Sequence, residues 1–177
     1  MSDSVAAVSR YFQDFVSQAD VVTSRPRDPF INRLYFTHAI TLMEKYLSDL
    51  LIAEIRSNPS ALRRLADTPR FHRQCLPIPK ALNISIGEFI VHAMQNEVWH
   101  RVNDVKVFYR AALKVEFHVP IALRDAIDKR HHITHRNGTD LQGNAVAVTD
   151  DELLGLYCEL TRFLKDIDGK YMLARGT

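Results

Sequence analysis

The feature that most constrains the fold is a long run of apolar residues at helical spacing, from Phe30 to Ile55. The pair Asp28-Pro29 precedes it and is typical of a helix start, with aspartate as the N-cap and proline at the first helical position. A helix of this length spans roughly 40 Å. We therefore expect it to be the longest helix and the central spine of the fold.

Similar signals predict helices on both sides of this spine. Asn58-Pro59 repeats the start signal, and Ser85 with Glu88 forms a capping box. Gly138 follows a helix that begins at Pro120, where glycine is the favoured left-handed terminator. Together these patterns predict an all-α bundle of six or seven helices in one domain, residues 1–177, with helices near 4–19, 30–55, 59–66, 85–98, 103–113, 120–138 and from about 150 onward.

Two segments do not follow the helical pattern. Thr68–Ala81 contains three prolines and is predicted to be a loop. Lys114–Val119 alternates between apolar and polar residues, which indicates either a short strand or a connector.

The composition is that of an ordinary globular chain. Of the 177 residues, 46% are hydrophobic and 25% are charged, and the net charge is +2. The basic residues comprise 16 arginines and 7 lysines, a balance that favours planar recognition of anions. This balance alone does not establish nucleic-acid binding.

The two cysteines and the lack of a long continuous apolar run indicate the cellular compartment in which the protein is expected. Cys75 and Cys158 lie far apart and form no CxxC pair, which fits a reducing compartment. Met1–Val5 shows no basic segment followed by an apolar run, and no apolar run approaches the roughly 18 residues needed to span a bilayer. We therefore expect a cytoplasmic protein with no membrane partner.

Arg130–Gly138 carries the densest chemistry of the chain, with three histidines, two arginines and an asparagine in nine residues. Imidazoles change charge near neutral pH, and guanidinium groups bind phosphate oxygens in a planar fork. On a helix, His131 and His135 lie roughly 40° apart, whereas Arg130 lies about 140° from His135. The charged groups thus flank the apolar stripe, which is typical of a helix end that lines a cleft. The alternative is a solvated helix end whose cations offset the helix dipole.

The same segment has one feature of a metal site. His131 and His135 have the i, i+4 spacing that can chelate zinc from one helix face. The segment contains no Asp or Glu, however, and arginines on both sides repel a cation. We therefore expect no metal and no cofactor, and a metal-dependent hydrolase is the weakest hypothesis.

The segment resembles the motif of HEPN domains, all-helical modules in which an arginine, usually followed by a polar residue, precedes a histidine by four to six residues. Arg130, His131 and His135 match it, and Arg130–Gly138 is similar to the longer form Arg-His-x-x-x-His-Arg-Asn-Gly of one branch. Met43–Leu51 also resembles the central helix of that branch.

This resemblance implies a metal-independent endoribonuclease that acts as a homodimer, with the two motif helices facing a shared cleft. It implies that His135 is the general acid or base, that Arg130 stabilises the phosphate and that His131 orients the site. The products would be a 2′,3′-cyclic phosphate and a 5′-hydroxyl. The protein would be a toxin or phage-defence effector, with RNA as substrate and an antitoxin or another protein as partner.

Further residues are candidates for binding the substrate. Arg136 could bind phosphate, and Asn137 could donate from its amide or support the turn. Glu44 lies on a polar seam of the long helix and could approach the motif or be a solvated or core-capping carboxylate. The other residues of this seam are Thr37, Thr41 and Ser48. The aromatic residues that could stack on bases are more typical of a core; they are Trp99, Phe108 and Tyr109. The alternative function is a non-catalytic HEPN module that binds RNA or protein.

Overall fold

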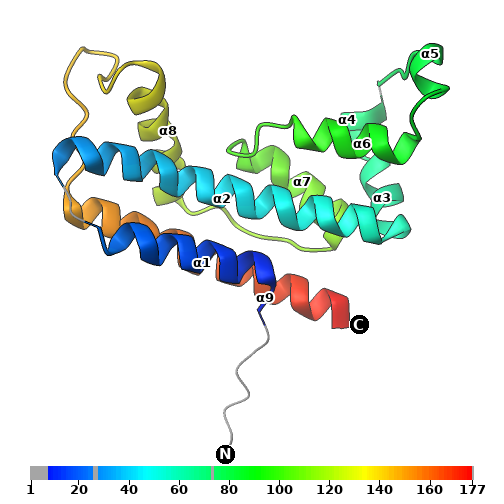
Figure 1. The fold of residues 1–177 in the computed structure, drawn as a ribbon, viewed down its shortest axis with the longest axis horizontal. Helices are drawn as coiled ribbons and strands as arrows, with labels where there is room; N and C mark the ends of the chain where they lie inside the picture. The colour runs from blue at the N-terminus through cyan, green and yellow to red at the C-terminus, as the bar shows by residue number, and fades with distance from the viewer. Residues whose placement is uncertain (1–7, 26–27, 73, 177) are drawn as a thin grey trace, which may run out of the picture.

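Helix α2, Pro29–Ser57, forms the spine of the molecule. The Asp28 carboxylate caps it as predicted, accepting the backbone N–H groups of Phe30 at 2.8 Å and Ile31 at 3.0 Å. The structure is a computed structural model that describes residues 8–25, 28–72 and 74–176. Within these ranges α2 contacts helices α1, α3, α6, α7, α8 and α9 (Figure 1).

The prediction of an all-helical fold is confirmed. The remaining helices are α1 (Arg10–Thr23), α3 (Pro59–Ala66), α4 (Pro69–His72), α5 (Ile78–Ala81), α6 (Ile86–Gln95), α7 (Val102–Leu113), α8 (Ile121–His135) and α9 (Asp150–Gly176). Seven of the helices in the described part of the chain have eight residues or more, and α4 and α5 have four each. None of these helices has the length and apolarity needed to cross a bilayer.

The helices are arranged along the two halves of α2. Helices α1 and α9 lie side by side along it, as Figure 1 shows. Helix α8 packs on its N-terminal half, where the Lys129 ammonium lies 5.6 Å from the Phe36 ring centroid. Helices α3, α6 and α7 cover its C-terminal half, and α5 projects from that end (Figure 1). The candidate motif and the projecting helices therefore lie at opposite ends of the spine.

The buried side chains form one continuous core around α2. The three aromatic residues considered for base stacking are all buried in it, which confirms the core interpretation: Trp99, Phe108 and Tyr109. The Tyr109 hydroxyl donates to the Leu47 carbonyl oxygen at 2.8 Å, so its polar atom is satisfied without a ligand.

A buried carboxylate fixes where α1 begins. Asp168 of α9 is fully buried and accepts from the Ser9 amide at 2.8 Å, from the Ser9 hydroxyl and from the Tyr46 hydroxyl at 2.9 Å. Ser9 is the N-cap, so the helix starts at Arg10 and continues to Thr23. The predicted end at Ala19 is four residues short, and the predicted start at Ser4 lies outside the described residues.

The two irregular segments differ from simple expectations. The predicted loop Thr68–Ala81 contains the single-turn helices α4 and α5. Lys114–Val119 is the connector between α7 and α8, because no strand occurs in the ranges the structure describes. The alternating sequence of this connector nevertheless matches its side-chain burial, since the apolar side chains enter the core and the polar ones face solvent.

Three helix ends also differ from the sequence-based bounds. Helix α6 ends at Gln95 rather than Val98, and α8 ends at His135 rather than Gly138. Helix α7 begins one residue before Asn103, and its N-cap is Arg101, which makes no side-chain capping bond.

Candidate functional site

The candidate motif occupies the last turns of α8 and the tight turn that follows. The Arg136 and Gly138 amides both donate to the His132 carbonyl oxygen, at 3.1 and 3.3 Å. Asn137 and Gly138 both have positive φ, at 51° and 77°, a region that glycine and asparagine enter at low cost. The Asn137-Gly138 pair thus ends the helix and turns the chain away.

His131 and His135 lie together on the open face of α8. Both are exposed, and their ring centroids are 4.8 Å apart. Partial desolvation, with the neighbouring imidazoles of His135 and His132, lowers the pKa of His131 below its ordinary value. Two imidazoles at this distance disfavour the state in which both are protonated.

Arg130 lies on a different side of the helix. It is half-buried, beside residues that face α2, and its Nε is buried without a hydrogen-bond partner. Helical geometry directs Arg130 about 140° away from His135 around the axis. The structure therefore brings the two histidines together, while Arg130 projects from another side of α8, near enough for its charge to help lower the pKa of His131.

The remaining motif residues vary in their environment. Arg136 and Asn137 follow the helix and are exposed. His132 is half-buried, and its Nδ1 has no hydrogen-bond partner. Its ring lies edge-on to His131, with 6.1 Å between the centroids.

Glu44 has a different neighbour from the one that the resemblance implies. Its Oε1 lies 2.5 Å from Nδ1 of His100, in the turn between α6 and α7. Among the described interactions, none joins Glu44 to Arg130 or His135. His100 was not predicted, since nothing in the local sequence links it to a residue 56 positions away.

Arg33 is a second residue that the sequence interpretation missed. Its guanidinium lies against Gly138, so close that a side-chain carbon there would collide with it. Arg33 precedes Thr37 by one helical turn and extends the polar seam of α2 that includes Glu44. Continuing that spacing backwards was the signal that could have found it.

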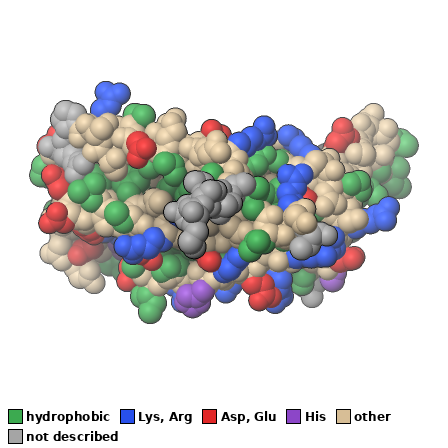
Figure 2. All heavy atoms as spheres, turned by 90° about the horizontal axis from the view of Figure 1, so that it is seen from below, with side chains coloured by type: hydrophobic (Ala, Val, Ile, Leu, Met, Phe, Trp, Pro, Cys, Tyr) green, Lys and Arg blue, Asp and Glu red, His purple; other side chains and the backbone are tan. Residues whose placement is uncertain are grey.

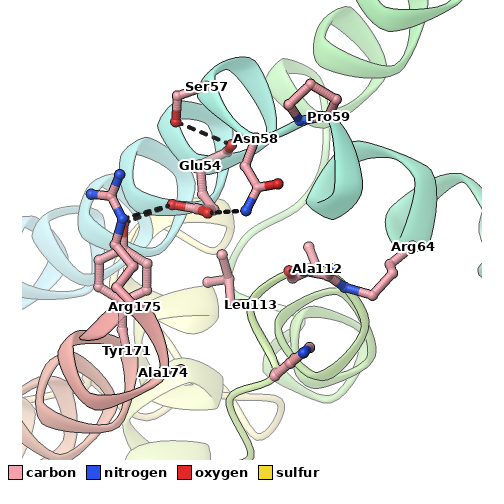
Figure 3. A pocket seen from close by; sticks show the side chains of 11 residues that line it. Glu54, Ser57, Asn58, Pro59, Arg64, Ala112, Leu113, Tyr171, Ala174 and Arg175 are labelled. Carbon is pink, nitrogen blue, oxygen red and sulfur yellow. Dashed lines mark hydrogen bonds and ion pairs between the residues drawn. The ribbon is translucent and has the colours of Figure 1, made fainter. Parts of the chain in front are cut away.

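A pocket of about 380 Å³ lies at the opposite end of α2 (Figure 3). The buried Glu54 carboxylate accepts from Asn58 at 2.8 Å and from the Tyr171 hydroxyl at 2.9 Å, and Arg175 lies 3.5 Å away. Arg64 donates to two carbonyl oxygens of α7 at 2.9 and 2.6 Å.

The C-terminal ends of α2, α7 and α9 meet at this pocket (Figure 3). Cations at these helix ends offset the negative ends of the helix dipoles. The lining arginines thus have a structural role, and we assign this pocket no ligand. In the described part of the chain, no group of three or more His, Cys, Asp or Glu residues is arranged to hold a metal ion.

Compared with known proteins, the chain matches no family model, no curated protein and no solved structure. The fold and the site define the protein only by its structure. It is an all-helical protein in which two paired histidines lie at the end of a helix, beside a left-handed turn.

Proposed function

We propose that this chain is a metal-independent endoribonuclease that acts as a homodimer through the end of α8. The observation that supports the proposal best is the pair His131 and His135, exposed on one helix face with 4.8 Å between ring centroids. One neutral and one protonated imidazole are the two groups that cleavage of RNA by its own 2′-hydroxyl requires.

The reaction proceeds in one displacement. Neutral His135 accepts the proton of a ribose 2′-hydroxyl, and that oxygen attacks the adjacent phosphorus. The bond to the 5′-oxygen breaks, and a protonated imidazole supplies the proton to that leaving oxygen. The products are a 2′,3′-cyclic phosphate and a 5′-hydroxyl. His131 orients the reacting groups, and Arg130 stabilises the charge that grows on the phosphate oxygens.

The second copy completes the cleft. Arg130 and His135 diverge around α8, so a phosphate bridging the two α8 ends of a dimer meets a guanidinium of one copy and an imidazole of the other. Arg136 and Asn137, both exposed at the same end, contact the flanking backbone. Such an enzyme would act as a toxin or phage-defence effector and require a protein inhibitor.

A non-catalytic role in binding RNA or protein is the second candidate. It is favoured by the half-buried position of Arg130 on a different side of α8 from His135. The experiment that separates the two is incubation of the purified chain with RNA in EDTA, with analysis of product ends. Cyclic phosphate formation by the wild type and its loss in His135→Ala support the enzyme. Salt-sensitive binding without cleavage, unchanged in His135→Ala, supports the binding module.

A further inference from the structure

A groove of about 380 Å³ runs between α8 and α9, separate from the exposed face of α8 that carries the paired histidines. Its floor is apolar and well packed, made by Phe36 of α2, Ala126 of α8 and Leu156 of α9, all buried. A cleft with such a floor leaves the core intact when empty and gains apolar contacts when filled.

The two walls of the groove have matching helical spacing. Each helix contributes residues at i, i+3, i+4 and i+7, namely 122, 125, 126 and 129 of α8 and 152, 155, 156 and 159 of α9. Two helices that each present one such row form the surface on which a third helix packs. At Gly155 an added side-chain carbon would meet no atom within 4 Å, so the groove is open to an incoming side chain there.

The rim of the groove is acidic. Lys129 and Glu152 pair across it at 2.5 Å, and this pair leaves one further carboxylate on each wall. Asp125 of α8 has no ion pair among the described residues, and Glu159 of α9 has only the exposed Arg162 at 3.3 Å. A basic partner would therefore meet one unpaired carboxylate on α8 and one weakly paired carboxylate on α9.

The basic side chains seen on one face of the molecule lie away from this acidic rim. On the face seen in Figure 2, Lys and Arg side chains gather mainly over the half that holds the C-terminal end of α9. The groove lies at the other end of that helix, so the carboxylates on its rim are not offset by that basic region. A phosphate backbone would meet like charge at this rim.

We propose that the α8–α9 groove is the docking site for a protein partner that presents an amphipathic helix. An aliphatic side chain of the partner occupies the space beside Gly155, and lysine or arginine residues one turn away lie beside Asp125 and Glu159. Charge complementarity excludes nucleic acid, and the paired rows of the walls favour a helix over an extended peptide. This proposal does not depend on ribonuclease activity.

The first test selects a displayed library of helical peptides, with one face randomised, against the full chain. We expect the selected peptides to carry an aliphatic anchor flanked by basic residues. They bind the wild type and lose at least about tenfold in affinity for Gly155→Leu, whose side chain fills the groove. The matched control is Gly169→Leu, because Gly169 is an exposed position of the same helix where an added carbon also meets nothing.

The second test exchanges the charges. The double variant Asp125→Lys, Glu159→Lys should weaken the basic peptides about tenfold, and the same peptides with glutamate in place of lysine should prefer the variant. As a control, circular dichroism and urea unfolding would establish that each variant is folded before its binding is compared. Selected peptides without basic enrichment, or peptides that bind Gly155→Leu and Gly169→Leu equally, would overturn the proposal. Self-association of the wild type that Gly155→Leu abolishes would instead identify a second copy as the occupant.

Discussion

The Arg33 guanidinium of α2 lies against the backbone of Gly138, the residue that ends the turn after α8. Gly138 is buried and has φ of +77°. The contact joins the spine of the fold to the segment that positions the paired histidines. The guanidinium end of Arg33 occupies the space that a side-chain carbon at residue 138 would need, so Arg33 would have to move aside for any other residue there.

Replacing this glycine should therefore destabilise the protein in two ways. Gly138→Ala adds left-handed strain of about 1–2 kcal/mol and displaces the guanidinium end of Arg33 from its place beside residue 138. Gly143→Ala is the matched control, because Gly143 also has positive φ, +86°, but open space around it. Urea unfolding should show a larger loss for Gly138→Ala, and Arg33→Ala should recover part of it. Equal losses at both glycines would contradict the steric role of Arg33.

Activity on RNA should depend on His135 and on pH. His135→Ala should lower the cleavage rate in EDTA by about a hundredfold to ten-thousandfold, the usual contribution of general acid–base catalysis. In the wild type the rate should fall at low pH, where the base is protonated, and at high pH, where the acid has lost its proton. A rate that is flat across the range in which imidazoles titrate would exclude this mechanism.

The pKa of His131 provides a test that needs no activity. Partial desolvation and the nearby His135 and His132 hold it below 6.5, so the ring becomes protonated only at more acidic pH. His135→Ala removes one of the neighbouring imidazoles that lower the pKa of His131, so this pKa should rise. Nuclear magnetic resonance titration of the ring measures both values. A shift in the opposite direction would show that the two rings do not interact as the structure has them.

The buried Asp168 should contribute strongly to stability. Asp168→Ala leaves the Ser9 and Tyr46 donors without their acceptor, and we expect a loss of about 3 kcal/mol in the free energy of unfolding. Tyr46→Phe removes one donor only and should cost about 1 kcal/mol. Hydrogen exchange should show faster opening of α1 in Asp168→Ala. If both variants lose the same amount, the bonds to Ser9 contribute nothing.

The phenol of Tyr171 should lose its proton at a higher pH than an exposed tyrosine does. Its burial, together with the hydrogen bond and charge of Glu54, raises the pKa of Tyr171 to about 12. The folded state therefore holds this proton when the unfolded chain has released it, so its contribution to stability is lost as the pH rises from about 10 to 12. Glu54→Gln removes the negative charge and should lower the pKa. An ultraviolet titration of the phenol measures it, and an unchanged value would argue against the pairing.

Local patterns predicted the parts of the fold that local chemistry determines. The starts at Asp28-Pro29, Asn58-Pro59 and Ser85–Glu88 are all confirmed by side-chain capping bonds, because a cap involves residues at most three positions apart. Helix α1 follows Ser9, whose hydroxyl accepts from the Phe12 amide as a local cap and also donates to Asp168, a residue 159 positions away that no local pattern identifies. Of the two alternatives for Lys114–Val119, a short strand or a connector, the structure shows the connector, because a strand also needs a partner strand, which a short pattern cannot supply.

In the candidate site too, the sequence predicted the features that depend on neighbouring residues but not the contacts between helices. The close approach of His131 and His135 follows from their i, i+4 spacing, and the left-handed turn follows from Asn137-Gly138. The partners contributed by other elements were not predictable, since the contact of His100 with Glu44 and that of Arg33 with Gly138 depend on how the helices pack. The roles of Arg130, Arg136 and Asn137 in binding remain predictions.

Because α2 contacts six other helices, most of the molecule should unfold as one unit. Removing any of those six exposes the spine, so they should melt together in a single cooperative transition. The single-turn helices α4 and α5 have no buried residues of their own among those described, and they can open while the rest stays intact. Brief protease treatment should therefore nick the chain near residues 69–81 first and leave two fragments that remain associated.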